Sequence, residues 1–308
     1  MEIRVLGPNG PTLSVVGLGC NNFGSRIDRD TSIAVARAAL DAGISHFDTA
    51  ERYGNGQSEE HLGDALKGRR DGAAIATKFE PRATKEPYTP GILARRIREA
   101  CEQSLRRLKT DRIDLYYQHY PDHDGPIEEV FETMAELIRA GKILHVGSSN
   151  VSATQINLAA NGSISGVLPR FICTQIEWNL LSRSVELDIV PAARSNGMGI
   201  VPFYPLASGL LTGKYKRDET FPDGSRFARS PDRFALGATN DNFDRVERFT
   251  AFATAHGHTI IELAVSWLLA QPGVASVICG ATSPEQVALN AGAGNWVLSA
   301  EQLVALPN

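Results

Sequence analysis

The sequence lacks the marks of several large classes of protein. No apolar run in its 308 residues approaches the roughly 18–20 residues that span a bilayer. The first residues, MEIRVLGPNG, contain no basic stretch followed by an apolar core, which argues against a secretory signal. Basic residues are not in excess, since 31 Lys and Arg stand against 35 Asp and Glu, whereas nucleic-acid binders carry a basic footprint. We therefore predict a soluble, cytoplasmic protein that binds neither nucleic acid nor membranes.

Cysteine and histidine are also scarce and scattered. The four cysteines lie far apart and form no CxxC pair, which fits reduced thiols better than disulfides or a zinc site. The seven histidines include no HExxH or comparable ligand spacing. We therefore predict no metal. The remaining composition, 43% hydrophobic and 21% charged, is that of an ordinary globular protein.

Eight short apolar runs alternate with amphipathic stretches. The runs are SVVGLG, ISHF, AAIATK, IDLYYQH, ILHVGSSN, FICTQIEW, GIVPFYP and VASVICG. Most of them end about 30 residues apart, which is the length of a strand, a helix and two short loops. This rhythm predicts a (β/α)₈ barrel. A doubly wound sheet is the alternative, but GLGCNNFG has Asn22 where the dinucleotide fingerprint GxGxxG needs its last glycine.

Two segments break the rhythm. Residues 1–13, with the turn sequence Gly-Pro-Asn-Gly, predict a small β-hairpin before the first barrel strand. A long loop over 207–240 and two helical patterns separate the seventh and eighth strands, so that one extra helix is expected there. Long loops of this kind often cover binding sites. No linker interrupts residues 1–308, and we predict a single barrel domain.

Several of the predicted strands end in a polar residue. In a barrel the carboxyl ends of the strands share one face, and active sites are built on that face. The residues are Asp48, Lys78, His119, Ser149, Asn150 and Gln175. We therefore predict that they converge into one site.

Tyr53 follows Asp48 in a glycine-rich turn and is predicted to reach the same face. A free tyrosine has a pKa of about 10, which a nearby ammonium group lowers. We expect Lys78, held by Asp48, to be that ammonium, and His119 to hydrogen-bond the oxygen that Tyr53 protonates. A Schiff base on Lys78, as in an aldolase, is the alternative chemistry. The helix that follows is predicted to be capped by Ser58, with acidic residues in its first turn.

In this order and spacing the motifs resemble the aldo-keto reductase family along nearly the whole chain. HFDTAERYGNGQSEEHLGDAL is similar to the first signature of the family, IATK to its lysine strand, and IDLYYQH to its histidine strand. GKILHVGSSN resembles the strand that follows, and TQIEWNLLSR, FYPLASGLLTGKY and GATSPEQVALN resemble the later cofactor segments. The resemblance implies a (β/α)₈ barrel that binds NADP(H) in an extended form and reduces aldehydes or ketones by hydride transfer.

The resemblance also implies residue roles. Tyr53 is the expected general acid, Asp48 and Lys78 are its tuning pair, and His119 orients the carbonyl. Cofactor-binding residues are expected to be Gly19, Ser149, Asn150, Gln175, Phe203, Tyr204, Leu206, Ser208, Leu210, Lys214, Gly280, Thr282, Ser283, Gln286 and Asn290. The expected substrate contacts are Asn21, Phe23 and Trp178, together with the loop over 215–240.

One departure from the family pattern bears on the cofactor. Thr282 stands where many members have an arginine that faces the 2′-phosphate of NADP, and a threonine offers only one hydroxyl. Lys214, Lys216 or Arg217 of the long loop are candidates to supply the charge. We predict NADP(H) ahead of NAD(H). Because members of the family associate with membrane channels, a cofactor-sensing regulatory subunit with little turnover is the alternative to a reductase of small carbonyl compounds.

Overall fold

Eight parallel strands close into a barrel in the computed structural model, which describes residues 1–81, 87–122, 124–162, 169–234 and 237–307. The strands are β3 (Val16–Gly19), β4 (His46–Asp48), β5 (Ala74–Phe79), β6 (Ile113–Gln118), β7 (Ile143–Ser149), β8 (Cys173–Glu177), β9 (Gly199–Phe203) and β10 (Val277–Gly280). β10 pairs with both β9 and β3, which closes the ring. The predicted (β/α)₈ barrel is confirmed, and the doubly wound alternative is wrong.

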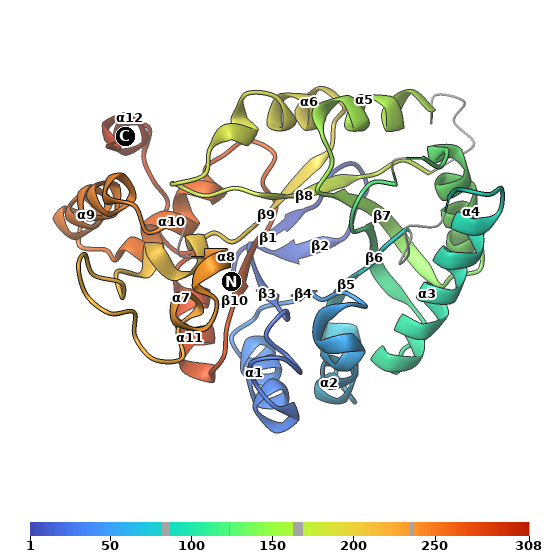
Figure 1. The fold of residues 1–308 in the computed structure, drawn as a ribbon, viewed down its shortest axis with the longest axis horizontal. Coiled ribbons are helices and arrows are strands. Elements are labelled where there is room, and N and C mark those ends of the chain that lie inside the picture. Colours follow the sequence, from blue (N-terminus) through green and yellow to red (C-terminus); the bar gives the residue numbers. More distant parts are fainter. Residues whose placement is uncertain (82–86, 123, 163–168, 235–236, 308) are drawn as a thin grey trace.

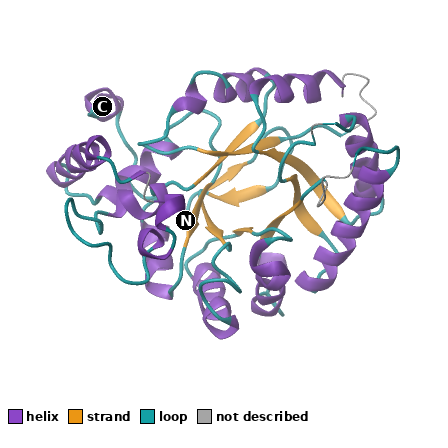
Figure 2. Ribbon diagram, viewed as in Figure 1, coloured by secondary structure: helices purple, strands orange, loops and turns teal. Residues whose placement is uncertain are grey.

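Helices surround the strands on the outside of the barrel (Figures 1 and 2). They include α1 (Arg29–Asp41), α2 (Gln57–Ala65), α3 (Ile92–Leu108), α4 (Ile127–Arg139), α5 (Ala153–Gly162), α6 (Ile189–Ser195), α11 (Pro284–Gly292) and α12 (Ala300–Ala305), and the short turns η2 (Arg70–Gly72) and η3 (Ser184–Glu186). α3 shows the pattern, because Leu93, Ile97 and Leu108 are buried at helical spacing. Among the described helices, none combines the length and the apolar character needed to cross a membrane.

The N-terminal hairpin covers one end of the barrel. β1 (Ile3–Val5) and β2 (Thr12–Ser14) pair antiparallel, as predicted. Leu6 and Leu13 pack against barrel residues that include Leu115 and Val201. At Gly7, which has a φ of +60°, a Cβ atom would lie 2.1 Å from the carbonyl oxygen of the residue before β8. The hairpin therefore closes the amino end of the barrel and leaves the carboxyl ends of the strands for a site.

The segment between β9 and β10 is more ordered than predicted. It contains η4 (Ala207–Thr212), α7 (Arg226–Arg229) and α8 (Pro231–Phe234), followed by the two predicted helices α9 (Asn240–Ala255) and α10 (Ile260–Leu269). The expectation of a continuous loop over 207–240 is wrong, because the rings of Tyr215 and Phe227 stack with centroids 4.1 Å apart and give this segment its own small core. Positions 235–236 of the predicted loop lie outside the described residues.

The start of α2 also differs from the prediction. Gly56, with a φ of +93°, precedes the first helical residue. Ser58 lies inside the helix, where its hydroxyl donates to the carbonyl oxygen of Cys20 and contacts the hydroxyl of Thr49. The predicted cap is wrong, because the Ser58 side chain turns toward the barrel and not toward the free N–H groups. The predicted acidic first turn is confirmed by Glu59 and Glu60.

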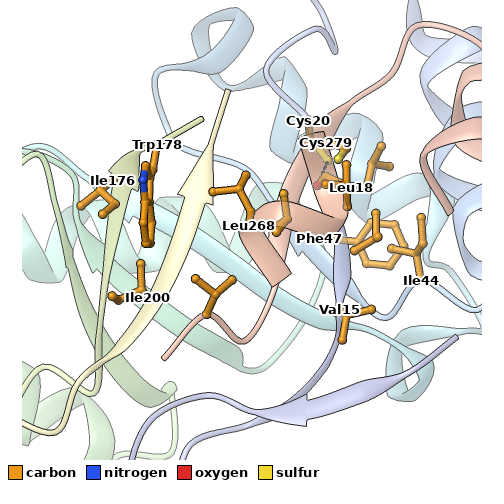
Figure 3. Packing of buried hydrophobic residues seen from close by; sticks show 14 of the residues in the cluster. Val15, Leu18, Cys20, Ile44, Phe47, Ile176, Trp178, Ile200, Leu268 and Cys279 are labelled. Carbon is orange, nitrogen blue, oxygen red and sulfur yellow. Dashed lines mark hydrogen bonds between the residues drawn. The ribbon is translucent and has the colours of Figure 1, made fainter. Parts of the chain in front are cut away.

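The main core fills the layer between the strands and the helices. Figure 3 shows Leu18, Ile44 and Phe47 packed together on one side and Trp178 beside Ile176 and Ile200 on the other. These side chains point away from the barrel axis because neighbouring residues of a strand alternate between its two faces. The alternate residues, such as Asp48 next to Phe47, are left to face the interior.

Candidate active site

Side chains from β4, β5 and β8 form a buried polar centre. Lys78 donates from Nζ to Oδ2 of Asp48 at 2.6 Å and to the carbonyl oxygen of Thr49 at 2.8 Å. Gln175 donates from Nε2 to Oδ1 of Asp48 at 2.7 Å. Both partners of the ion pair are buried, with Lys78 completely inaccessible. Burial lowers the pKa of Lys78, and the Asp48 carboxylate raises it.

Tyr53 lies next to this ion pair. It begins the turn η1 (Tyr53–Gly56), in which the three following residues all have positive φ, so that the chain reverses sharply. Nζ of Lys78 lies 5.2 Å from the centroid of the Tyr53 ring. The ring of His119, just after β6, meets the Tyr53 ring edge to face with centroids 5.9 Å apart. The four residues predicted to be catalytic are thus brought together.

The ionisation of Tyr53 differs from the expectation. Desolvation raises the pKa of its phenol well above the usual value of 10.0, and the nearby carboxylate of Asp48 raises it further. The predicted lowering of this pKa by Lys78 is wrong here, because desolvation and the Asp48 carboxylate outweigh the attraction of the ammonium group, which is paired with Asp48 at 2.6 Å. The phenol is therefore neutral at pH 7, which is the form that can donate a proton.

His119 is held neutral as well. Burial, followed by repulsion from Lys78 and Arg52, lowers the pKa of its imidazole to about 2. Its ring stacks on Tyr120 with centroids 4.7 Å apart, and Asn150 donates from Nδ2 to its carbonyl oxygen at 2.9 Å. Nδ1 of His119 is buried and has no hydrogen-bond partner within the described part of the chain. The imidazole is thus available as a neutral hydrogen-bonding group.

The depressed pKa of His119 predicts a pH dependence of stability. Below the ordinary pKa of 6.5 the unfolded chain binds a proton here, whereas the folded protein does so only near pH 2. Above pH 6.5 the ring is neutral in both states and the free energy of unfolding does not depend on its protonation. Below that pH the free energy of unfolding falls, and it is about 3 kcal/mol lower at pH 4. Urea unfolding at pH 7, 5.5 and 4 measures this loss. In His119→Asn the dependence should be shallower, and an unchanged slope would contradict the assignment.

The residues predicted to hold a nicotinamide ring adjoin this centre. Ser149, the last residue of β7, donates its hydroxyl to the carbonyl oxygen of Gln175 at 3.0 Å and accepts from Nδ2 of Asn150 at 3.0 Å. Phe203 ends β9 and is partly exposed, with its ring 5.1 Å from that of Tyr204. The hydrogen-bonded side chains of Ser149 and Asn150, and the ring of Phe203, therefore lie on the side of the ion pair formed by β7 to β9.

The residues predicted for the adenosine end gather at the start of α11. Ser283 caps the helix by accepting from the backbone N–H of Gln286. Thr282 donates from its N–H and its hydroxyl to Oε1 of Gln286, at 2.8 and 3.1 Å. Asn290 reaches back from Nδ2 to the carbonyl oxygen of Gly280 at 3.2 Å. The hydroxyl of Thr282 is thus already engaged within the protein.

The segment after β9 carries the other residues predicted for the cofactor. Leu206 precedes η4, Ser208 has a φ of +58°, and Leu210 is buried. Nζ of the exposed Lys214 lies 5.0 Å from the Tyr215 ring centroid. Two other candidate cations differ in their surroundings: Lys216 is exposed, and Arg217 binds Asp244 and Glu247 on α9. Arg217 is therefore committed to a surface ion pair.

Two of the predicted substrate residues are in the core. Trp178 is 1% exposed, its ring lies 5.7 Å from that of Trp267, and its Nε1 donates to Glu186. Phe23 is completely buried. The prediction that these rings contact a substrate is corrected, because burying them against other side chains is more favourable than leaving them at an open strand end. Asn21 is partly exposed beside β10 and keeps its place as a candidate.

A buried carboxylate was not predicted as part of the site. Glu59 is completely buried and accepts from the hydroxyl of Thr77 and from Nε of Arg107, both at 2.6 Å. Thr77 precedes Lys78 in β5, and α2 follows the turn of Tyr53. Glu59 therefore ties the element that carries Tyr53 to the strand that carries Lys78. The signal in the sequence was its helical spacing to the buried Leu62.

Cysteine and acidic groups form no metal site within the described residues, where no group of three or more His, Cys, Asp or Glu is arranged to hold an ion. The four cysteines are buried and free, and burial raises the pKa of the Cys173 and Cys279 thiols to about 12. These two thiols therefore remain protonated and unreactive at neutral pH.

The end of β10 offers room for an extended ligand. A Cβ atom on Gly280 would lie 3.5 Å from Nδ2 of Asn22 and 3.8 Å from Oδ1 of Asn21, so the glycine leaves a cradle beneath two amides. The first turn of α11 follows, and helix N-termini favour phosphate groups. With the aromatic ring of Phe203 nearby, this donor set fits a nicotinamide dinucleotide lying across the strand ends.

Comparisons with known proteins agree with this geometry. Residues 15–307 match the family described as "Aldo/keto reductase family". Aldo-keto reductase YhdN of Bacillus subtilis (strain 168) is 37% identical over 308 residues, covering 98% of this chain and 91% of the relative. A probable voltage-gated potassium channel subunit beta of Oryza sativa subsp. japonica is 34% identical, covering 94% and 90%. L-glyceraldehyde 3-phosphate reductase of Escherichia coli O157:H7 is 32% identical, covering 99% and 91%.

The fold and these similarities define an NAD(P)H-dependent oxidoreductase of carbonyl compounds built on a (β/α)₈ barrel. The chain belongs to the aldo/keto reductase family.

Proposed function

We propose that the protein reduces aldehydes or ketones with NADP(H), and that Tyr53 protonates the carbonyl oxygen. One observation carries the proposal: the neutral phenol of Tyr53 and the neutral imidazole of His119 stand edge to face beside the buried ion pair of Lys78. A bound dihydronicotinamide supplies the hydride. NAD(H) is the alternative cofactor, because Thr282 offers no charge to a 2′-phosphate.

The residues divide the work on the carbonyl group. A carbonyl oxygen placed between Tyr53 and His119 accepts a hydrogen bond from each, and these bonds strengthen as negative charge develops on the oxygen. Tyr53 then gives up the proton of its hydroxyl. Lys78, whose Nζ lies 5.2 Å from the Tyr53 ring centroid, stabilises the phenolate left behind. Asp48 keeps that ammonium charged and fixes its position.

The cofactor is proposed to lie along the ends of β7 to β10. Ser149, Asn150 and Gln175 would hold the carboxamide of the nicotinamide, and Phe203 would stack on its ring. Tyr204, Leu206, Ser208 and Leu210 would cover the diphosphate, and Lys214 is the cation of this segment nearest to η4. The residues proposed for the adenosine end are Gly280, Thr282, Ser283, Gln286 and Asn290. Gly19, which ends β3 next to β10, is the remaining residue proposed to contact the cofactor, through its backbone, because a Cβ atom there would lie 2.8 Å from Cγ2 of Ile278.

A regulatory role is the second candidate. The Oryza sativa relative, and one from Arabidopsis thaliana with 33% identity, are both named as probable voltage-gated potassium channel subunits beta. In such a role the cofactor would bind and turnover would be slow. A Schiff base on Lys78 has less support, because its ammonium group is fully buried and already donates two hydrogen bonds.

The test is a fluorescence titration of the purified protein with NADPH and with NADH, followed by a panel of aldehydes. We expect tight binding of NADPH and aldehyde-dependent oxidation of the bound cofactor. Tight binding without turnover of any carbonyl would favour the regulatory role. If neither cofactor binds, both candidates fail.

A further inference from the structure

Tyr117 lies inside the barrel next to the buried ion pair, and the proposed reaction gives it no role. In the parallel register of β5, β6 and β7, Lys78 pairs with Tyr117, and Tyr117 pairs with Gly147. Side chains of paired residues point to the same face of a sheet. Tyr117 is completely buried. It is therefore the residue of β6 that faces the interior beside Lys78.

The Tyr117 ring is fixed by the two strands beyond it. It crosses β7 at Gly147, where a Cβ atom would lie 2.6 Å from Cε1 of Tyr117 and 2.9 Å from Sγ of Cys173. On β8 the thiol of Cys173 donates to the hydroxyl oxygen of Tyr117 at 3.4 Å. The glycine thus gives the ring the space to cross the strand, and the thiol holds the hydroxyl at its far end.

The ring lies close to the ammonium group of Lys78. Nζ of Lys78 is 5.8 Å from the centroid of the Tyr117 ring and 5.2 Å from that of the Tyr53 ring. Both distances are within the roughly 6 Å over which an ammonium group is attracted to an aromatic face. The oxygen acceptors on Asp48 and Thr49 account for two of the three ammonium protons. Two aromatic rings therefore complete the surroundings of a buried charge.

Most titratable groups near Lys78 are uncharged at neutral pH. Besides Asp48, those in the described part of the chain are Cys20, His46, Tyr53, Glu59, Tyr117 and His119. Burial raises the pKa of the thiol and of both phenols well above their usual values, and lowers the pKa of the two imidazoles to about 4 and about 2. Glu59 is paired with Arg107. The Asp48 carboxylate and the aromatic rings are thus left to offset the burial of the ammonium group.

We propose that Tyr117 is a positioning residue for the reduction, and that its ring keeps the Lys78 ammonium group charged and in place beside Tyr53. The attraction comes from the negative face of the ring, so it needs no charge on the phenol. A charged Lys78 is what stabilises the phenolate formed at Tyr53. This inference rests on the proposed function, because Tyr117 acts on the rate only through Lys78 and Tyr53.

The test replaces Tyr117 by phenylalanine and by pentafluorophenylalanine. The two rings have nearly the same shape, but the fluorines withdraw electrons and make the ring face positive, whereas that of phenylalanine is negative. In wild type and Tyr117→Phe, kcat should fall at the same high pH, where Lys78 loses its proton. In Tyr117→pentafluorophenylalanine the charged form is less stable, so kcat should fall at a pH about one unit lower.

The ionisation of Lys78 can also be measured without turnover. The nitrogen NMR signal of its ammonium group, assigned by its loss in Lys78→Met, is titrated with pH in the full chain. We expect its pKa to fall by about one unit between Tyr117→Phe and Tyr117→pentafluorophenylalanine. Tyr116 is the matched control, because it precedes Tyr117 in β6, is equally buried, and packs on Phe79 at the other face of the strand. The same two substitutions of Tyr116 should change neither quantity.

The inference is overturned if the pKa of Lys78 shifts no more in the Tyr117 pair than in the Tyr116 pair. A shift of that pKa with an unchanged pH profile of kcat would overturn the role in the reaction. A failure of the proposed function gives a different result. If the protein reduces no carbonyl but the Lys78 signal shifts as expected, the reductase is removed and the contact between the ring and the ammonium group stays supported.

Discussion

Replacing Tyr53 by phenylalanine is expected to lower kcat by about 10²–10⁴-fold, the usual contribution of a general acid. The substitution removes one hydroxyl and keeps the ring that packs edge to face on His119. The affinity for NADPH should stay within about twofold, because no cofactor contact is assigned to that hydroxyl. Single-turnover oxidation of bound NADPH on adding an aldehyde measures the chemical step directly.

Tyr88→Phe is the matched control for Tyr53→Phe. Tyr88, which lies between β5 and α3, donates its hydroxyl to Glu129 of α4 and is assigned no part in the reaction. This variant should keep kcat within about twofold. If Tyr53→Phe retained more than a tenth of the wild-type rate, the proton donor would have to be another group or water held by His119.

Lys78→Met is expected to have the largest effect on stability. It leaves the buried carboxylate of Asp48 without its cation, and breaking a buried ion pair from one side costs about 3–5 kcal/mol. The hydrogen bond from Gln175 to Oδ1 remains and offsets part of that cost. The rate should fall by about 10²-fold or more, because the phenolate formed at Tyr53 loses its ammonium. Urea unfolding and steady-state kinetics measure the two effects.

A double-mutant cycle with Asp48→Asn distinguishes the loss of the ion pair from a nonspecific loss of stability. Removing both charges relieves the unpaired carboxylate, so Asp48→Asn/Lys78→Met should be more stable than Lys78→Met alone, with a coupling of about 2 kcal/mol or more. Activity should not return, since the ammonium is still missing. Lys67→Met, at an exposed position, controls for the substitution itself. Additive free energies in the cycle would mean that Lys78 and Asp48 do not act as a pair.

The barrel could be predicted from the sequence because its signals are local. Each strand is a short apolar run, several of the runs end in a polar residue, and the order of the runs predicts the order of the strands. Asp48, at the end of β4, and His119, just after β6, fall at the same end of the barrel for this reason. The hairpin before β3 was predicted from one turn sequence, whereas its place against the end of the barrel was not predicted and comes from the packing of Leu6 and Leu13.

The remainder depended on contacts between distant segments. The core position of Trp178 is decided by α10, which lies nearly 90 residues further along the chain. The ordered segment before α9 depends on aromatic side chains that meet only after the chain has folded. The neutral state of Tyr53 depends on its burial, which raises its pKa most, and on the nearby carboxylate of Asp48. In each case a single sequence shows the residue type but not the partner.

The hairpin packs Leu6 and Leu13 against one end of the barrel, so the site is open to ligands only at the other end, where the strands have their carboxyl ends. Whatever arrives and whatever leaves must cross the same rim, which is formed by the loop after β3 and the segment from η4 to α8. Substitutions in these rim segments would therefore be expected to change the substrate preference, while the buried ion pair of Lys78 and Asp48 stays the same.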